Sequence, residues 1–215
     1  MNKSLRNVLL VVLGLVGVGA GVALSVKADI GMSSYDAFAT TLANIVSIKV
    51  GTMTIIVNTV CVLIQLLFLR KNFEVRRLLQ LVAAFVLGYI INFFLYNILG
   101  SFIPDNYIVR LIMFLSGQVL VAVSIALMLA INYVSMPLEP TVMVIADYLK
   151  KDFAKLRQAL DGILIVIILV LTYIFKTDLT IREGTIIGFI IFAPIMNFFF
   201  KRFKSYLLNE TKTLS

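Results

Sequence analysis

The side chains of this sequence that are suited to chemistry lie in two short segments and at one isolated acid. The first segment, residues 27–36, reads Lys-Ala-Asp-Ile-Gly-Met-Ser-Ser-Tyr-Asp. Gly31 can release the chain from helical geometry, and a serine after it can cap a following helix. Such a helix start presents free N–H groups and a positive dipole end, which can hold an anion or carboxylate. The alternative is an ordinary interfacial loop. The candidate binding residues here are Ser33, Ser34, Tyr35 and Asp36.

The second segment is Ser-Met-Pro-Leu-Glu-Pro at residues 135–140. Pro137 and Pro140 prevent a preceding helix from continuing and suit the first turn of a new one. Glu139 lies between them and is the second candidate acid. Its alternative role is that of a carboxylate solvated at the cytoplasmic surface.

Asp161 is the isolated acid, and it follows Arg157 by one helical turn at the start of an apolar stretch. An acid at the centre of a membrane helix costs about 2.5–3.5 kcal/mol, and less near the interface. One interpretation is an ion pair with Arg157 near the surface. The other is a gating or proton-carrying acid that faces the protein interior, with Asn58 as its counterpart.

Composition excludes several kinds of active site. The chain contains no His, which excludes His-based metal sites and Ser-His or Cys-His nucleophile systems. Cys61 is the single cysteine, so an internal disulfide is excluded. We therefore expect no cofactor, no bound metal and no enzymatic activity.

Long apolar runs define the class of protein. The chain has 215 residues, of which 61% are hydrophobic and 14% charged, too apolar for a soluble domain. We expect an all-α, polytopic membrane protein, because helices satisfy their backbone polar groups within lipid. A signal peptide at the N-terminus is the less favoured alternative, since the first run is long and five more follow. The predicted spans are Val8–Val26, Thr52–Leu69, Leu78–Leu99, Leu111–Asn132, Gln158–Phe175 and Gly184–Phe200.

The basic residues predict the orientation. Fourteen of the 19 lysines and arginines fall before the first span, after the sixth, or in the second–third and fourth–fifth connections. By the positive-inside rule, these regions and both termini are cytoplasmic. The net charge of +8 is therefore a topology signal rather than a nucleic-acid surface, and the clusters can contact anionic lipid.

Two stretches, Ser33–Val46 and Met136–Leu149, fit neither a span nor a short loop. Both are moderately apolar, carry acids and are too short to cross the bilayer. If they did cross, the basic clusters would fall on alternating sides of the membrane. We therefore predict that they are re-entrant or interfacial helices.

An internal repeat relates the two stretches. A shift of 103 residues places Asp36 on Glu139 and Asn58 on Asp161. Each half then holds three spans and one short helix, so the halves are related by inversion, as in many secondary transporters. We expect Asp36 and Glu139 to line one central polar cavity, bordered by Asp161 and Asn58. The whole is one integral membrane domain, 1–215, with repeats at about 8–100 and 108–203.

Small and polar residues within the spans predict helix contacts. Gly17 and Gly21 have the spacing of close helix packing, which we prefer to a path for a sliding solute. Asn92 and Asn197 are predicted to form hydrogen bonds between helices. Gly31 and Pro137 are the expected hinge positions.

The first half resembles the YczE/YitT-related bacterial membrane proteins. The matching residues are Gly21, Ala23, Ala28, Gly31, Ser33, Asp36, Gly51 and Thr52. Ser34 departs from the pattern, since the family usually has Pro there. The resemblance implies a multi-pass protein of the bacterial cell membrane that is transporter-like, and it supplies no substrate.

Three functions fit these features. The leading hypothesis is a transporter or exporter of an unidentified small solute, coupled to protons through buried acids. The first alternative is a substrate-binding membrane subunit that works with a separate ATPase. The second is an accessory or signalling protein without transport activity. Assembly into a homo-oligomer is left open.

The predicted topology is testable by cysteine labelling. With Cys61 replaced, Asn106→Cys is expected to react with an impermeant maleimide added to intact cells, because its loop is predicted to be outside. Asn72→Cys is expected to react only after the cells are permeabilised. The reverse pattern would refute the orientation.

Overall fold

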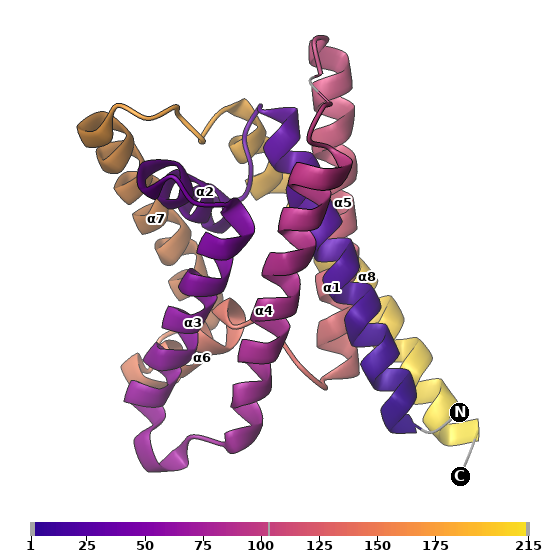
Figure 1. The fold of residues 1–215 in the computed structure, drawn as a ribbon. Coiled ribbons are helices and arrows are strands. Elements are labelled where there is room, and N and C mark those ends of the chain that lie inside the picture. The colour runs from indigo at the N-terminus through magenta and orange to yellow at the C-terminus, as the bar shows by residue number, and fades with distance from the viewer. Residues whose placement is uncertain (1–2, 103, 214–215) are drawn as a thin grey trace.

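The computed structural model describes residues 3–102 and 104–213, and this part of the chain consists of helices joined by short connections, without strands (Figure 1). The described residues form eight α-helices, which follow one another in the predicted order. Short 3₁₀ turns at Arg70–Asn72 and Val75–Leu78 lead into α4, and a π-helical segment, Phe93–Ile98, follows it. The α-helices are α1 (Lys3–Ala28), α2 (Ser34–Val46), α3 (Val50–Leu69), α4 (Leu79–Asn92), α5 (Tyr107–Ile131), α6 (Leu138–Leu149), α7 (Phe153–Phe175) and α8 (Glu183–Thr213).

Among the described residues, six helical segments are long and apolar enough to cross a membrane, as the sequence predicts. Their ends differ from the predicted ones because apolarity marks the lipid-embedded part of a helix and not its whole length. The fifth begins at Phe153 and not at Gln158, since Asp152 caps it by accepting a hydrogen bond from the Lys155 amide (3.0 Å). The sixth continues past Phe200 through basic and polar residues that favour helix.

The two predicted short helices are present as α2, with 13 residues, and α6, with 12 residues. At 1.5 Å per residue each is about 20 Å long or less, shorter than a ~30 Å hydrocarbon layer. Their last turns end at Ser47 and Lys150, both in the left-handed conformation. In Figure 1, α2 lies near one end of the long helices and α6 near the other.

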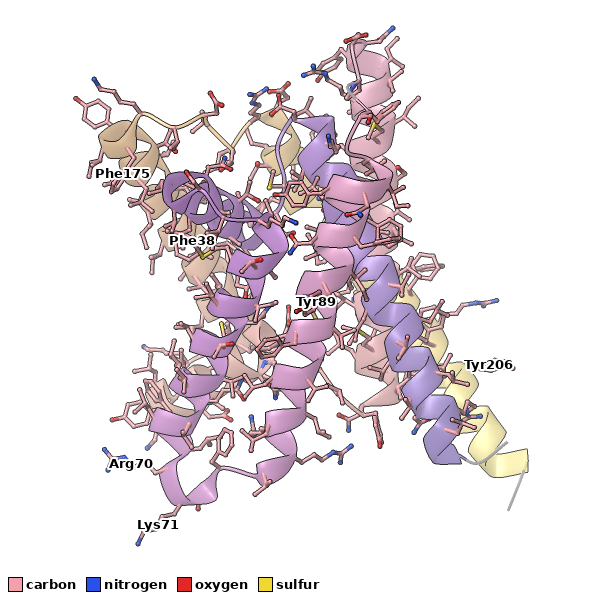
Figure 2. All side chains as sticks on the ribbon, in the orientation of Figure 1. Phe38, Arg70, Lys71, Tyr89, Phe175 and Tyr206 are labelled. Atoms are coloured by element: carbon pink, nitrogen blue, oxygen red, sulfur yellow. The ribbon has the colours of Figure 1, made fainter. Side chains whose placement is uncertain are left out.

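The long helices run alternately up and down, so their connections fall at two ends of the molecule. Figure 1 shows the first turn of α1 and the last turns of α8 at the same end. In Figure 2, Arg70, Lys71 and Tyr206 lie toward that end, whereas Phe175 lies toward the other. This arrangement agrees with an even number of crossings.

The helices form two groups. In the first, α1 packs against α5 and α4, and α5 packs against α8. In the second, α3 and α7 each contact both short helices, α2 and α6. The groups are joined mainly where α3 packs on α4. Within the described residues, α7 and α8 make at most marginal contact with each other, so the side between them lacks the helix crossing that closes the α3–α4 side.

The α3–α4 junction is a close crossing held by an asparagine. A Cβ atom added to Gly51 would lie 2.0 Å from the carbonyl oxygen of Gly88. The Gly51 amide donates to Asn92 Oδ1 (2.9 Å), and Asn92 Nδ2 donates to the Thr52 hydroxyl (3.3 Å). The interhelical bond expected of Asn92 is therefore present. The same expectation for Asn197 is wrong, because that side chain is exposed and has no hydrogen bond in the described structure.

The α1–α5 crossing is equally close, and Gly17 and Gly21 lie at it. A Cβ atom on Gly17 would meet Ser124 Oγ at 2.1 Å, and one on Gly21 would meet the Gly117 carbonyl oxygen at 2.6 Å. Small residues at these positions allow the two backbones to approach, which is how membrane helices gain packing energy in lipid.

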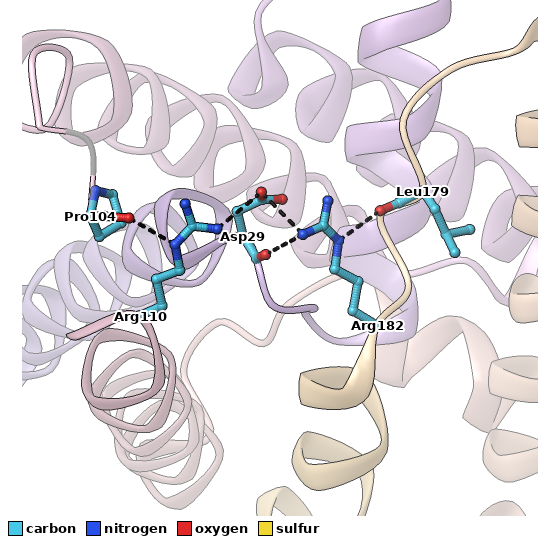
Figure 3. A network of polar contacts seen from close by, with 5 residues as sticks. All are labelled: Asp29, Pro104, Arg110, Leu179 and Arg182. Carbon is cyan, nitrogen blue, oxygen red and sulfur yellow. Dashed lines mark hydrogen bonds and ion pairs between the residues drawn. The ribbon is translucent and has the colours of Figure 1, made fainter. Parts of the chain in front are cut away.

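Arginines tie the helix ends together at both ends of the molecule. At one end, Asp29 follows α1 in the left-handed conformation. Arg182 donates to its carbonyl oxygen (2.7 Å) and pairs with its carboxylate (3.2 Å), which also lies 3.6 Å from Arg110 (Figure 3). At the other end, Asn132 follows α5 in the same conformation, and Arg76 donates to its carbonyl oxygen (3.5 Å) and to that of Tyr133 (3.0 Å).

The glycine crossing generates a stability prediction. Gly21→Ala is expected to lower the free energy of unfolding of the purified protein by about 1–3 kcal/mol, because the added methyl group forces α1 and α5 apart. Gly162→Ala is the matched control, since its Cβ would have no neighbour within 4 Å. Circular dichroism in detergent measures both. Equal effects of the two changes would contradict the close crossing.

Candidate functional site

A cavity of about 250 Å³ lies between the two helix groups. All seven residues predicted as a binding site line it, although they come from four different helices and one connection. They are Ser33, Ser34, Tyr35, Asp36, Asn58, Glu139 and Asp161. Their proximity makes the cavity the candidate functional site, and solute binding by these residues remains a prediction.

The cavity has one polar and one apolar wall. Residues of α2, α3, α6 and α7 supply the acids, the hydroxyl groups and one arginine. The helices of the first group supply a mostly apolar wall, interrupted by Gln118 and Thr185. Its apolar members are Val18, Val22, Leu87, Ile91, Val121, Ile125, Phe189, Phe192 and Met196. An apolar pocket with a few convergent polar groups is the common form of a small-molecule site.

The start of α2 is built by the chain break that the sequence predicts. Gly31 has φ +120°, a conformation that other residues rarely adopt, and an added Cβ would lie 2.5 Å from the Thr185 amide nitrogen. Ser33 then caps the helix, accepting from the Asp36 amide (3.1 Å) and donating to the Asp36 carboxylate (2.7 Å). The break therefore holds Asp36 in the first turn, at the wall of the cavity.

The first turn of α2 also connects α3 and α7. The Ser34 hydroxyl donates to Asp161 Oδ1, and the Tyr35 hydroxyl donates to Asn58 Oδ1 (2.9 Å). Arg157 forms an ion pair with Asp161 at i,i+4 spacing. The two interpretations of Asp161 are thus compatible, because the acid is paired with Arg157 and also faces the cavity, with only 15% of its side chain exposed.

Asn58 has an unused hydrogen-bonding group in the cavity wall. Only 1% of the residue is exposed, and Tyr35 occupies one end of its amide. The Nδ2 atom at the other end is buried and has no hydrogen-bond partner in the described structure. Leaving such a group unpaired costs about 1–3 kcal/mol, which a bound molecule could recover by accepting a hydrogen bond.

Glu139 lies in the first turn of α6, after the buried Pro137. The Pro137 carbonyl oxygen accepts from the Thr141 amide (3.1 Å) and from Gln65 Nε2 (3.2 Å), which fixes the start of the helix against α3. Glu139 faces the cavity without an ion-pair partner among the described residues.

Gln65 is a structural residue that the sequence analysis did not single out. It is fully buried on α3, where Nε2 also donates to Gln80 (2.9 Å) and to the Thr141 hydroxyl (3.0 Å). Its Oε1 accepts from Arg77 (2.9 Å). A glutamine inside an apolar span is expensive unless it is paired, and this cost is the signal that could have identified it.

The charges in the cavity are unbalanced toward acid, with three carboxyl groups and one guanidinium. Burial raises the pKa of Asp36 above its ordinary value, although Ser33 and Arg157 oppose the shift. Burial likewise raises the pKa of Glu139, with a further increase from the neighbouring Asp161 and Asp36 charges, and Arg157 again opposes it. Among the described residues, no group of three or more His, Cys, Asp or Glu side chains is placed to hold a metal ion.

The raised pKa values of Asp36 and Glu139 generate a pH prediction. Between the ordinary pKa near 4 and the raised one, the folded protein binds more protons than the unfolded chain, so its stability falls as pH rises. Asp36→Asn and Glu139→Gln are expected to reduce this fall, as measured by melting temperature between pH 4 and 8. Asp105→Asn, an exposed acid, is the control and should retain the wild-type slope. Unchanged slopes in both cavity variants would contradict the assignment.

A family model described as a family of unknown function, DUF6198, matches residues 5–201. The chain is also 22% identical over 200 residues to the Bacillus subtilis (strain 168) protein named "Uncharacterized protein YyaS", a match that covers 93% of this chain and 95% of that protein. No solved structure matches it at a significant level. Because the family match runs from the first turns of α1 into α8, the chain belongs to the DUF6198 family.

Proposed function

We propose that this protein is a transporter or exporter of a small solute, with proton coupling through the cavity acids. The observation that carries the proposal is the cavity itself, which joins carboxyl groups from α2, α6 and α7 to an apolar wall. An accessory or signalling protein has no need of such a cavity. Its volume of about 250 Å³ is near the lower end for ligand pockets, which favours a small solute.

An inverted repeat is part of the proposal, and two sets of backbone features support it. Left-handed residues end α1 and α5 at Asp29 and Asn132, and they end α2 and α6 at Ser47 and Lys150. The members of each pair are 103 residues apart, which is the shift that aligns Asp36 with Glu139. An arginine also binds the carbonyl group at the end of both α1 and α5.

The two helix groups suggest how such a cavity could change its access. In transporters with inverted repeats, one bundle rocks against another around a fixed site. Here the groups are joined by the Gly51–Gly88 crossing, whereas α7 and α8 are scarcely in contact. We assign the α3–α4 crossing as the hinge side and the α7–α8 side as the one that opens.

The setting of the protein belongs to the same proposal. The basic-residue distribution favours a cell-membrane location with both termini in the cytoplasm. The motif from Gly21 to Asp36 favours a bacterial protein related to the YczE/YitT proteins.

Reconstitution of the purified protein alone tests the proposal. Liposomes with a trapped pH dye are exposed to a panel of amines, carboxylates, sugars and peptides, and solute-dependent proton flux is recorded. Ile165→Trp should abolish the flux because Ile165 lines the cavity. Val166→Trp is the matched control, since this neighbour is 60% exposed on the outside of α7 and should retain the flux.

Three results would contradict the proposal. Flux that survives Ile165→Trp would show that the solute does not pass through the cavity. Flux that appears only when an ATPase partner is added would favour the substrate-binding subunit instead. No flux with either preparation would favour an accessory role.

A further inference from the structure

Among the described residues, two acids in the cavity have no ion-pair partner. The single guanidinium that faces the cavity, that of Arg157, is paired with Asp161, which also accepts from Ser34. Asp36 is bonded only within its own helix start, to Ser33, and Glu139 has no ion pair in the described structure. If all three acids are ionised, the lining carries a net charge of −2, which is costly away from water. Protons or a cationic solute can neutralise it.

The other lining groups leave this charge uncompensated. Besides Asp36 and Glu139, the titratable or charged groups near them are Tyr35, Cys61, Arg157 and Asp161. Burial raises the pKa of Tyr35 well above 10, so its hydroxyl stays neutral. Residues of α1, α4, α5 and α8 that line the cavity are uncharged. The two acids without an ion-pair partner are therefore the groups whose charge a proton or a bound cation would neutralise.

Two further features describe the rest of a ligand. Asn58 lines the cavity, and its Nδ2 atom is buried without a hydrogen-bond partner in the described structure, so an acceptor on the ligand would satisfy it. The wall opposite the acids, which includes Phe189, Phe192 and Met196, requires an apolar body. Aromatic faces also attract organic cations.

We infer that the solute is a small amphipathic organic cation with a hydrogen-bond acceptor, and that it binds in exchange for protons on Asp36 and Glu139. This inference rests on the proposed transport function and names its substrate class. When the ammonium group enters, each carboxyl group that ionises releases its proton to the medium, and the ion pair replaces the O–H bond. When protons reach the cavity from one side of the membrane, they can protonate the two acids again. The cation then loses its ion pair and is released on that side.

Three probes of similar shape and different charge test the inference by calorimetry on the purified wild-type protein. They are 2-phenylethylamine, 2-phenylethanol and 3-phenylpropanoate. The amine is expected to bind best. If one proton is exchanged, its apparent Kd should fall about tenfold for each unit by which the pH rises. Titrations in two buffers of different ionisation enthalpy should detect at least one proton released for each amine bound.

Variants assign the effect to the acids and to Asn58. The double variant Asp36→Asn/Glu139→Gln should lose amine binding and proton release, whereas Asp105→Asn should retain both. The hydroxylated probe 2-amino-1-phenylethanol should bind more tightly than 2-phenylethylamine to the wild type, and Asn58→Leu should remove this difference.

Several outcomes would overturn the inference. Binding of the carboxylate probe as tightly as the amine would identify the start of α2 and Arg157 as an anion site. Amine binding that is independent of pH, or that survives in the double variant, would show that the two acids do not bind the amine in exchange for protons. If no probe binds while the liposome panel reveals another transported solute, the substrate class is wrong and the transport proposal stands. If no solute moves in that assay, the transport proposal fails as well.

Discussion

The free-energy cost of placing charge inside a membrane-embedded cavity is the constraint on which this structure depends. Three carboxyl groups share a small space with one guanidinium, and each would cost several kcal/mol if it were left charged and unsolvated. Asp161 offsets this cost through its ion pair with Arg157 and the hydrogen bond that it accepts from Ser34. Asp36 and Glu139 meet it by favouring the protonated form, which is why their pKa values rise. We propose that a site built in this way responds to both protons and cations.

The scaffold keeps these groups in place by close helix crossings on either side of the cavity. Gly17 and Gly21 bring α1 to α5, and Gly51 brings α3 to α4. The short helices α2 and α6 are held differently, by the chain break at Gly31 and by the buried Gln65 network. The three acids therefore all belong to the second group, so relative motion of the groups would change the distances between the acids and the apolar wall.

Much of this arrangement could be predicted from the sequence, because lipid imposes simple rules on it. Apolar runs predict the six long helices, and the shift that aligns Asp36 with Glu139 predicts that the two acids share one cavity. The helix ends are predicted less accurately, since caps such as Asp152 act beyond the apolar run.

Asn197 and Gln65 show a second limit of the sequence. Composition reveals that a polar residue lies in a span, but not which partner it faces. The weak contact between α7 and α8 could not be predicted for the same reason. These two helices are apolar enough to span a membrane, as are α3 and α4, which do pack closely, so apolarity does not distinguish the two pairs. Partners across helices depend on the rotation of each helix about its axis, which packing determines.

The central claim is that Asp36 and Glu139 hold exchangeable protons in the cavity, and infrared difference spectroscopy tests it most directly. The account predicts a carbonyl stretching band of protonated carboxyl groups in the purified protein near pH 6. This band should weaken in Asp36→Asn and in Glu139→Gln, and it should fall in the wild type when 2-phenylethylamine is added at constant pH. A band that is absent at pH 6, or one that the amine leaves unchanged, would contradict the account.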